Sequence, residues 1–282
     1  MTGRWVGVPA AVLAAGLAAI CGCWSCGCFG AAAQQLPRPA CGGEIIARGT
    51  ASRLIDGRTF VLDDGSEVRL AAIEVPPLPL QADGAPGGAA ARDALAGLLA
   101  GGAIVLRQAQ PQKTDRYGRL AAYAFAARDG AEHSIQADLI AAGFARVAAW
   151  VGSRPCALEL LGREEAARAA KLGLWRHSYY DLLDAENPAG VLAEQGRFAL
   201  VEGKVVSVRE SGATIYVNFG RRWSTDFTVT ILKRNARSFR AAGLEPSKLA
   251  GRHIRVRGWI EERGGPLIEA TRPEQIEITD RE

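Results

Sequence analysis

Four short stretches decide the fold of this chain: IDGRT at residues 55–59, VRLAAIEVP at 68–76, TDRYGR at 114–119 and LGLW at 172–175. The first two lie in a region of alternating apolar residues interrupted by Asp-Gly pairs. Such pairs favour tight turns between antiparallel strands. We therefore expect residues 50–62 to form two strands broken at Asp56-Gly57, with a further strand at 66–73.

Outward from these stretches, the apolar periodicity changes several times. It predicts helices at 89–99, 134–142 and 157–172, strands at 104–108 and 120–126, and a Pro- and Gly-rich loop at 76–88. Five short strands with interspersed helices are typical of a small closed barrel with helices packed on it. The sequence therefore predicts a β-rich α+β fold built on a five-stranded OB-type barrel.

In this order and at these spacings, the four stretches resemble the landmarks of the thermonuclease (staphylococcal nuclease) family. The resemblance covers about residues 47–178. It implies a calcium-dependent phosphodiesterase in which carboxylates hold the cation through oxygen ligands. A glutamate would activate the attacking water, and two arginines would neutralise the charge that develops on the phosphate.

Part of that machinery is present. The resemblance places Arg69 and Arg119 at the two phosphate-binding arginines. It also matches Asp115, Tyr117 and Gly118, which shape the loop that presents the second arginine. The chain is therefore expected to keep the means of binding a phosphate.

Three other positions depart from the family pattern. Arg58 stands at the first metal carboxylate, Glu74 at the second, and Pro77, which does not titrate, at the glutamate base. Two charges about 4 Å apart interact by about 4 kcal/mol at an effective dielectric of about 20, so Arg58 would repel calcium and attract Glu74. We expect an Arg58–Glu74 ion pair and neither metal nor other cofactor. In the alternative, Arg58 points to solvent, and an acid such as Asp56 holds calcium.

The tyrosines that pack against nucleotide in the family fall on Ala149 and Val151. Trp150 lies between them, and it could replace them only if the end of the strand rotates. The three histidines of the chain are far apart and share no ligand spacing, so we expect none of them to bind a metal.

The N-terminal region indicates export. Residues 1–33 combine Arg4, an apolar middle and a small-residue end, which is typical of a signal peptide cleaved near Ala33. An uncleaved membrane anchor is the rival interpretation, and lipidation of Cys23 is a third. Cleavage removes four of the six cysteines and leaves Cys41 and Cys156, which we expect to form a disulfide in a periplasmic or secreted protein.

We divide the remaining chain into a nuclease-like domain at 34–178, a linker at 179–196 with a break at 187–190, and a second domain at 197–282. Lys and Arg number 17 against 19 Asp and Glu in residues 34–196, but 16 against 11 in 197–282. The C-terminal part is thus the basic one, as suits a polyanion partner. Its predicted strands at 199–208, 213–219, 227–231, 253–261 and 276–279, with a helix at 233–242, indicate a second OB-like barrel.

One predicted hairpin of this second barrel gathers aromatic and basic residues. These are Tyr216, Phe219, Arg221, Arg222, Trp223 and Phe227. OB barrels bind single strands through stacked aromatics and a basic groove, and the odd spacing of Tyr216 and Phe219 puts them on opposite faces. Alternatively, both rings belong to the core, and the module packs on the first domain or binds a cell-envelope partner.

Three classes of function remain. The first is a catalytically degenerate protein that binds nucleic acid or another phosphate-bearing polyanion. The second is an active, calcium-dependent secreted nuclease. The third is a structural protein of the cell envelope.

Overall fold

A computed structural model describes residues 40–78, 87–128, 131–222 and 224–280 of the chain. The expected signal segment 1–33 lies outside the described residues, so neither its cleavage nor its alternatives are addressed by the structure. Within the described residues, no helix combines the length and the apolar character that crossing a membrane requires.

The first part of the chain forms a seven-stranded sheet within the described residues. Its strands are β1 (Ile45–Gly49), β2 (Ala51–Leu54), β3 (Thr59–Leu62), β4 (Glu67–Leu70), β6 (Ile104–Gln108), β7 (Leu120–Arg128) and β8 (Ala131–Ser134). The order is β1-β6-β7-β4-β3-β2, with β8 also paired to β7. Neighbours are antiparallel except β4 and β7, which run parallel.

The two ends of this order are pieces of one strand. Thr50 alone separates β1, which pairs with β6, from β2, which pairs with β3. The pairing order therefore begins and ends on the same stretch of chain, which is compatible with the predicted five-stranded barrel.

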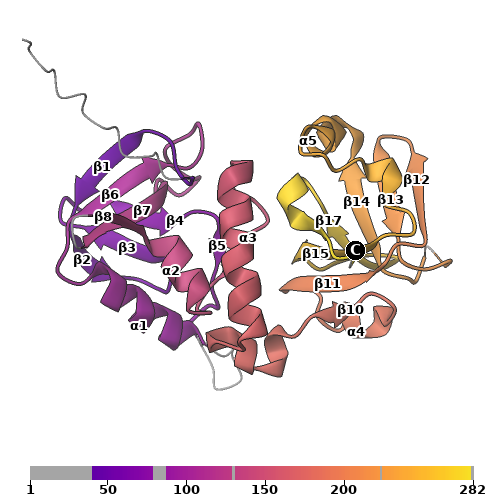
Figure 1. The fold of residues 1–282 in the computed structure, drawn as a ribbon, viewed down its shortest axis with the longest axis horizontal. Helices are drawn as coiled ribbons and strands as arrows, with labels where there is room; N and C mark the ends of the chain where they lie inside the picture. The colour runs from indigo at the N-terminus through magenta and orange to yellow at the C-terminus, as the bar shows by residue number, and fades with distance from the viewer. Residues whose placement is uncertain (1–39, 79–86, 129–130, 223, 281–282) are drawn as a thin grey trace, which may run out of the picture. The chain divides into compact units, whose positions relative to one another are not determined.

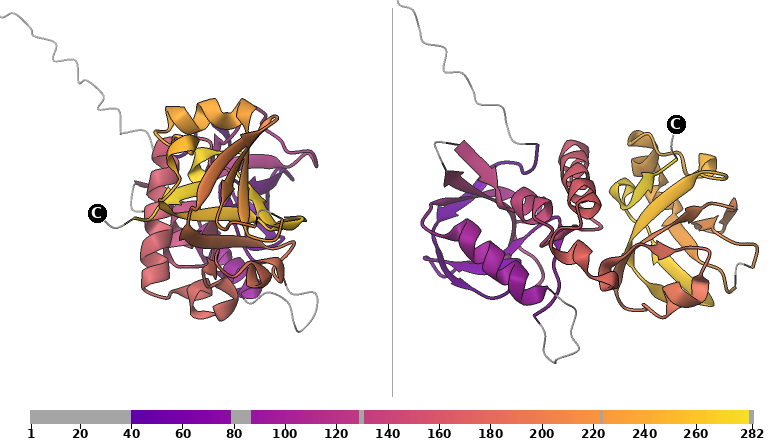
Figure 2. Two further views of the ribbon diagram at one scale, coloured as in Figure 1. Left: turned by 90° about the vertical axis from the view of Figure 1, so that its right-hand side faces the viewer. Right: turned by 60° about the horizontal axis from the view of Figure 1, so that its bottom comes forward.

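Three helices accompany this sheet: α1 (Gly88–Leu99), α2 (Ile135–Ala141) and α3 (Arg154–Ala169). In Figures 1 and 2, α2 and α3 lie side by side. Ser134 and Ser153 cap α2 and α3, because each side-chain oxygen accepts a hydrogen bond from a backbone N–H of the first turn. The predicted helices are confirmed, although α3 begins and ends three residues earlier than expected.

The core of this part joins the sheet to all three helices. It contains Phe60, Val68, Phe125, Leu139 and Leu160, each no more than 2% exposed. The predicted disulfide is present in this core, where Cys41 is bonded to Cys156 at the start of α3. It closes a loop with a sequence separation of 115 residues.

Between the two main cores the chain is folded, not extended. Residues 173–192 contain η1 (Gly173–Arg176), η2 (Ser178–Tyr180), β10 (Leu183–Asp184) and α4 (Pro188–Leu192). The break that we expected at 187–190 is wrong: Asn187 caps α4 by accepting a hydrogen bond from Gly190 N–H, and Pro188 occupies the first turn. Ala185 and Val191 belong to the C-terminal core.

The C-terminal part contains two sheets. One has the order β10-β11-β15-β18, and the other β12-β13-β14-β17-β16. The new strands are β11 (Phe198–Lys204), β12 (Ser207–Ser211), β13 (Thr214–Asn218), β14 (Thr228–Leu232), β15 (His253–Trp259), β16 (Glu261–Arg263), β17 (Gly265–Glu269) and β18 (Ile276–Ile278). The helical segments are η3 (Lys233–Asn235), α5 (Ala236–Ala241), η4 (Pro246–Lys248) and η5 (Pro273–Gln275).

The two C-terminal sheets are connected through continuous chain on both sides. Two residues separate β11 from β12, and Ile260 alone separates β15 from β16. With β14 parallel to β17, this arrangement is compatible with the predicted OB-like barrel, although the predicted strand 199–208 is divided at Val205. Phe227, Phe239 and Ile254 are fully buried in its core.

Candidate functional site

Strand pairing gathers the three arginines that the sequence analysis singled out. Arg58 directly precedes β3, Arg69 lies in β4, and Arg119 directly precedes β7. Thr59 is paired with Arg69 across β3 and β4, and Arg69 is paired with Ala121 across β4 and β7. Residues that are 61 positions apart in sequence, from Arg58 to Arg119, thereby come to one edge of the sheet.

The predicted ion pair between Arg58 and Glu74 is present. Arg58 Nη1 lies 2.6 Å from Glu74 Oε2, and the two side chains are 18% and 19% exposed. The same nitrogen donates a hydrogen bond to the carbonyl oxygen of Ile73 at 3.2 Å. The guanidinium is therefore fixed against β5 (Ile73–Glu74) and does not point to solvent.

A sharp bend in the backbone brings Glu74 to this position. Ala72 adopts a positive φ of 64°, which turns the chain from β4 into β5. The buried amide of Gln136 supports the bend, because its Nε2 donates to the carbonyl oxygens of Ala71 and Ala122. Its Oε1 accepts a hydrogen bond from the N–H of Ala124.

The second arginine is held by the turn that precedes β7. Asp115 Oδ1 accepts hydrogen bonds from the backbone N–H groups of Tyr117 and Arg119, and Asp115 Oδ2 lies 2.7 Å from Arg119 Nη2. Gly118 has a φ of 79°, a conformation that side chains disfavour. Partial burial raises the pKa of Asp115, but the hydrogen bonds from Arg119 and the turn outweigh burial and lower it overall.

The side chain of Tyr117 extends from this turn into solvent. Its side chain is 66% exposed, and its ring lies 5.0 Å from the guanidinium carbon of Arg119 and 4.8 Å from that of Arg116. An accessible aromatic ring therefore lies next to the second arginine.

Arg69 lies between the other two arginines and makes no side-chain hydrogen bond or ion pair with any described residue. Burial lowers the pKa of its guanidinium, and the positive charges of Arg58 and Arg119 lower it further. Arginine side chains keep their proton in proteins, so three positive charges meet here, and the donors of Arg69 have no partner among the described residues.

These contacts do not fit the ligand set that calcium requires. Glu74 is paired with Arg58, and Asp56 Oδ1 accepts a hydrogen bond from the backbone N–H of Arg58 at 2.8 Å within its own turn. No group of three or more His, Cys, Asp or Glu that could hold a metal occurs in the described part of the chain. At the position of the expected base, Pro77 is exposed.

Comparison with known protein families gives one match within this chain. Residues 67–177 match the family described as staphylococcal nuclease homologue. These residues form a staphylococcal-nuclease-like domain. No curated protein matches the chain. The matched region contains Arg69, Glu74 and the 115–119 turn, whereas Arg58 and β1 to β3 lie before it.

The positions expected to carry nucleotide-packing tyrosines are occupied differently in the nuclease-like domain. Val151 is fully buried, and its carbonyl oxygen accepts a hydrogen bond from the Tyr123 hydroxyl. Ala149 packs against a small core with Trp175 and Phe198. Trp150 is partly buried, with its ring close to Gly152.

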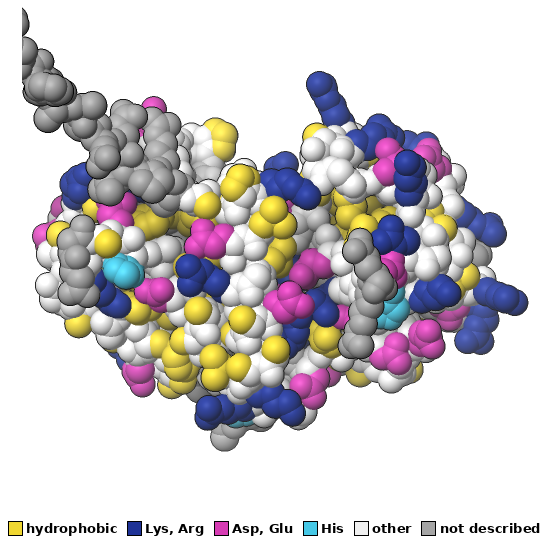
Figure 3. All heavy atoms as spheres, in the orientation of Figure 1, with side chains coloured by type: hydrophobic (Ala, Val, Ile, Leu, Met, Phe, Trp, Pro, Cys, Tyr) yellow, Lys and Arg dark blue, Asp and Glu magenta, His cyan; other side chains and the backbone are white. Residues whose placement is uncertain are grey.

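The two aromatic side chains Tyr216 and Phe219 of the C-terminal part differ in exposure, as their odd spacing predicts. Tyr216 is 36% exposed, whereas Phe219 is 4% exposed and packs 5.0 Å from Phe227. Arg221 and Arg222 are exposed in the following turn, where Arg222 lies 3.7 Å from Asp226; Trp223 lies outside the described residues. Lys and Arg side chains are prominent on this part of the chain in Figure 3.

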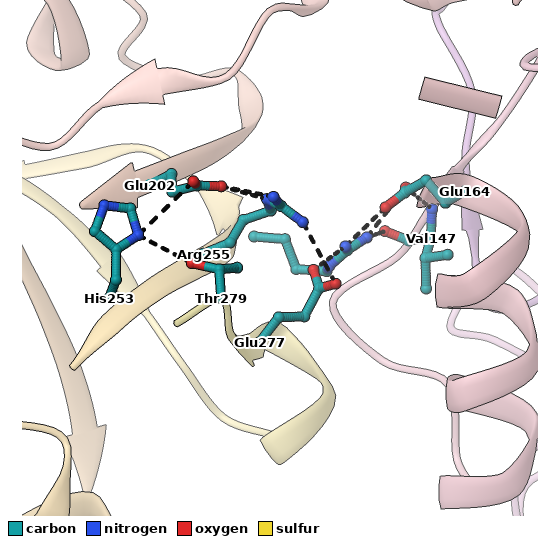
Figure 4. A network of polar contacts seen from close by, with 8 residues as sticks. Val147, Glu164, Glu202, His253, Arg255, Glu277 and Thr279 are labelled. Atoms are coloured by element: carbon teal, nitrogen blue, oxygen red, sulfur yellow. Dashed lines mark hydrogen bonds and ion pairs between the residues drawn. The ribbon is translucent and has the colours of Figure 1, made fainter. Parts of the chain in front are cut away.

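Sequence reasoning missed a set of buried charges that connects the nuclease-like domain to the C-terminal part. Arg257 of β15 is fully buried and donates to both carboxylate oxygens of Glu164 in α3, at 3.1 and 2.7 Å. It also contacts Glu277 and the carbonyl oxygen of Val147 (Figure 4). Burial lowers the pKa of Arg257, but the two carboxylates outweigh burial and raise it overall.

Arg146 makes a second connection of this kind. It pairs with Glu74 in the short ladder of β5 and β9 (Arg146–Val147), and its Nη1 donates to the carbonyl oxygen of Phe198 at 2.8 Å. Its guanidinium also lies 5.0 Å from the rings of Tyr180 and Phe198. The only sequence signal was an arginine between apolar residues in a short strand, which gives no partner.

Proposed function

We propose that this chain is an exported protein that binds nucleic acid, or another phosphate-bearing polyanion, and no longer hydrolyses phosphodiesters. The nuclease-like domain supports a nuclease-like or nucleic-acid-binding role. The observation that carries the proposal is the 2.6 Å contact between Arg58 and Glu74. A cation of the protein itself thus stands where the resemblance requires acidic ligands for calcium.

Two separate requirements of hydrolysis are missing. The first is the metal, because Arg58 neutralises Glu74 and repels a second cation. The second is the general base, which typically contributes about 10²–10⁴-fold in rate and which Pro77 cannot supply. Either loss would weaken catalysis, and together they favour a binding protein over an enzyme.

Binding of a phosphate requires only the arginines that the chain keeps. Arg69 offers free guanidinium donors, and Arg119 is held in place by Asp115. Both can contact phosphate oxygens, and the exposed ring of Tyr117 can stack on a neighbouring base. Such contacts depend on electrostatics, so affinity should fall as salt is added.

The disulfide supports export. A bond between Cys41 and Cys156 persists in oxidising compartments such as the periplasm or the extracellular space, and it is rare in the cytosol. An exported location is compatible with the expected signal peptide at residues 1–33.

The binding part of the proposal is tested with a fluorescent single-stranded DNA and the purified chain in a calcium chelator. We expect binding without metal, and we expect Arg69→Gln and Arg119→Gln each to reduce the salt dependence of log K by about one. Arg92→Gln removes the same charge from an exposed position on α1 and should change little. Binding that requires calcium, or that is equally affected by all three variants, would contradict the proposal.

The catalytic part is tested by adding calcium to the same DNA. We expect no cleavage by the unmodified chain and little from Arg58→Asp or Pro77→Glu alone. The double variant should gain more than the two single variants combined, as residues that act as a unit do. Calcium-dependent cleavage by the unmodified chain, lost in Arg119→Ala, would instead make the protein an active nuclease.

A further inference from the structure

The carboxylate of Glu74 belongs to a strand of only two residues. This carboxylate forms the arginine site together with Arg58, Arg69 and Arg119. In the described part of the chain, β5 pairs only with β9, which also has two residues. Glu74 lies opposite Arg146 in this ladder, and the N–H of Ala148 donates to the carbonyl oxygen of Ala72 at 2.9 Å. So short a ladder supplies few hydrogen bonds, and the position of Glu74 therefore depends on what holds β9.

The other edge of β9 is held by the buried ion pair between α3 and β15. Val147 N–H donates to Glu164 Oε1 at 2.7 Å, and the Val147 carbonyl oxygen accepts from Arg257 Nη1 at 3.1 Å (Figure 4). Arg257 and Glu164 also bond to each other, and their side chains are 0% and 1% exposed. Both backbone polar groups of Val147 therefore bond to this pair, and β9 connects it to β5.

The C-terminal part makes two further contacts with the same segment. Arg146 Nη1 donates to the carbonyl oxygen of Phe198 in β11 at 2.8 Å. Glu274 Oε1 in η5 accepts a hydrogen bond from Val151 N–H at 3.2 Å. Residues 146–151 are thus held by β11, β15 and η5, all of which follow the region that matches the nuclease family.

The position of Glu74 decides whether Arg69 is open to a ligand. The carboxylate of Glu74 lies on Arg58, which also donates to the carbonyl oxygen of Ile73 in the same strand. Burial lowers the pKa of the Arg69 guanidinium, and the negative charge of Glu74 acts in the opposite direction, so Arg69 lies within electrostatic reach of this carboxylate. If β5 were released, Glu74 would be free to pair with Arg69 and to compete with a phosphate for its donors.

We propose that Glu164 and Arg257 are positioning residues of the arginine site. They hold β9, and through it β5, so that Glu74 stays on Arg58 and the donors of Arg69 remain open to phosphate. The C-terminal part thereby regulates the affinity of a site that lies in the nuclease-like domain. This inference rests on the proposed function, because it concerns the same phosphate-binding site.

Hydrogen exchange tests the structural step without any ligand. Glu164→Leu with Arg257→Met removes both bonds to Val147 and replaces the buried pair by apolar side chains, a change that is often tolerated. We expect the Ala148 amide to exchange at least about tenfold faster in this double variant, because the ladder of β5 and β9 opens more often. Amides shared between β6 and β7 in the same domain should exchange as in the unmodified chain.

Two further variants complete this experiment. Glu261→Leu with Arg263→Met removes an exposed ion pair and should leave the exchange of Ala148 unchanged. Arg257→Lys keeps the buried charge, but its single ammonium group replaces a guanidinium that reaches Val147 and Glu164 together. It should accelerate the same amide to a smaller extent, and it serves as the test variant if the double variant does not fold.

Binding of fluorescent single-stranded DNA in a calcium chelator tests the effect on the site. We expect the Glu164→Leu, Arg257→Met variant to bind at least about threefold more weakly than the unmodified chain. Glu74→Gln should raise affinity more in this variant than in the unmodified chain, because only there does the carboxylate compete for Arg69. Glu67→Gln removes a carboxylate 3.8 Å from Arg119 Nε and should raise affinity equally in both backgrounds.

The outcomes distinguish this inference from the proposed function. Unchanged exchange at Ala148 would overturn the inference, and so would faster exchange at the β6 and β7 amides to the same degree, which indicates general loosening. Equal gains from Glu74→Gln in the two backgrounds would also overturn it. Failure of the unmodified chain to bind DNA would refute the proposed function, and the exchange of Ala148 would then decide whether the buried pair positions β5.

Discussion

Arg58 extends its guanidinium from the turn before β3 to the carboxylate of Glu74, and both side chains are about one-fifth exposed. An exposed ion pair contributes about 0–1 kcal/mol to stability, and this partly screened pair should contribute little more. Its importance is chemical, because the guanidinium of Arg58 neutralises a carboxylate that the family resemblance assigns to a metal ligand. Of the three arginines of this site, Arg69 is the one whose guanidinium has no hydrogen bond or ion pair with a described residue.

Burial of Tyr123 predicts that the stability of the fold depends on pH. It is 2% exposed, its hydroxyl donates to the Val151 carbonyl, and burial raises its pKa well above the ordinary value of 10. Because the folded chain holds the proton more tightly than the unfolded chain does, this stabilisation is complete below pH 10. It declines as pH rises above 10, by at most about 1.4 kcal/mol per pH unit.

Urea unfolding between pH 8 and pH 11 measures this decline. Tyr123→Phe should be less stable at pH 8, by about 0.5–1.5 kcal/mol for the lost hydrogen bond, but should lose stability less steeply above pH 10. Tyr117→Phe, which alters an exposed tyrosine, should follow the unmodified chain. An identical alkaline slope in Tyr123→Phe and the unmodified chain would show that another group is responsible.

At the scale of elements, the disulfide fastens α3 to the segment that leads into β1. Cys41 and Cys156 are both buried in the first core, and Cys156 Sγ lies 3.4 Å from the hydroxyl of Tyr123 in β7. The helix that carries Glu164 is thus anchored at its N-terminal end by a covalent bond. Its position does not rely on packing alone.

Removing this bond should lower stability substantially. A cross-link over a separation of 115 residues restricts the unfolded chain, and loss of such a bond typically costs about 2–5 kcal/mol. We expect Cys41→Ser with Cys156→Ser to reduce the unfolding free energy by this amount in urea. A reductant should destabilise the unmodified chain equally and leave the double variant unchanged; equal midpoints for oxidised and reduced chain would refute the prediction.

Local sequence signals predicted most of the elements, but not their ends or distant partners. Helix 157–172 was placed three residues late because Ser153 as the cap and Pro155 in the first turn were overlooked, while Gly173 was taken as the stop. The Arg58–Glu74 pair followed from charge and resemblance together. Gln136 and Arg146 gave no such signal, because a buried polar side chain is recognisable only once its partners are placed.

For the whole molecule, the buried pair of Arg257 and Glu164 joins α3 of the nuclease-like domain to β15 of the C-terminal part, in addition to the contact of Arg146 with Phe198. Arg257 and Glu164 are 0% and 1% exposed, and the carboxylate also accepts a hydrogen bond from Val147 N–H at 2.7 Å. Acidic and basic side chains alternate from this pair onward. Figure 4 shows the series continuing through Glu277 and Arg255 to Glu202. Each charge in this series is compensated by the next.

Breaking this pair should be costly. Arg257→Met leaves Glu164 buried and unpaired, for which we expect a loss of about 3–5 kcal/mol in unfolding free energy. Arg257→Met with Glu164→Leu should recover much of that loss, since apolar replacement of both partners is often tolerated. Calorimetry should also show one transition in the unmodified chain and two in Arg257→Met.

Arg263→Met is the matched control. It removes an arginine whose pair with Glu261 is 63% and 46% exposed, so we expect a change of at most about 1 kcal/mol. If Arg257→Met were no more harmful than this variant, the buried pair would not hold the two cores together.

The short ladder between Glu74 and Arg146 has a consequence for excising the nuclease-like domain. A fragment cut at residue 177 would strip Arg146 of the Phe198 carbonyl and leave Glu164 without Arg257. Arg146 lies in β9, which pairs with β5, and Glu164 accepts a hydrogen bond from Val147 of the same strand. The boundary of the family match therefore cuts through interactions beside the site, and a fragment that keeps them must extend past residue 257.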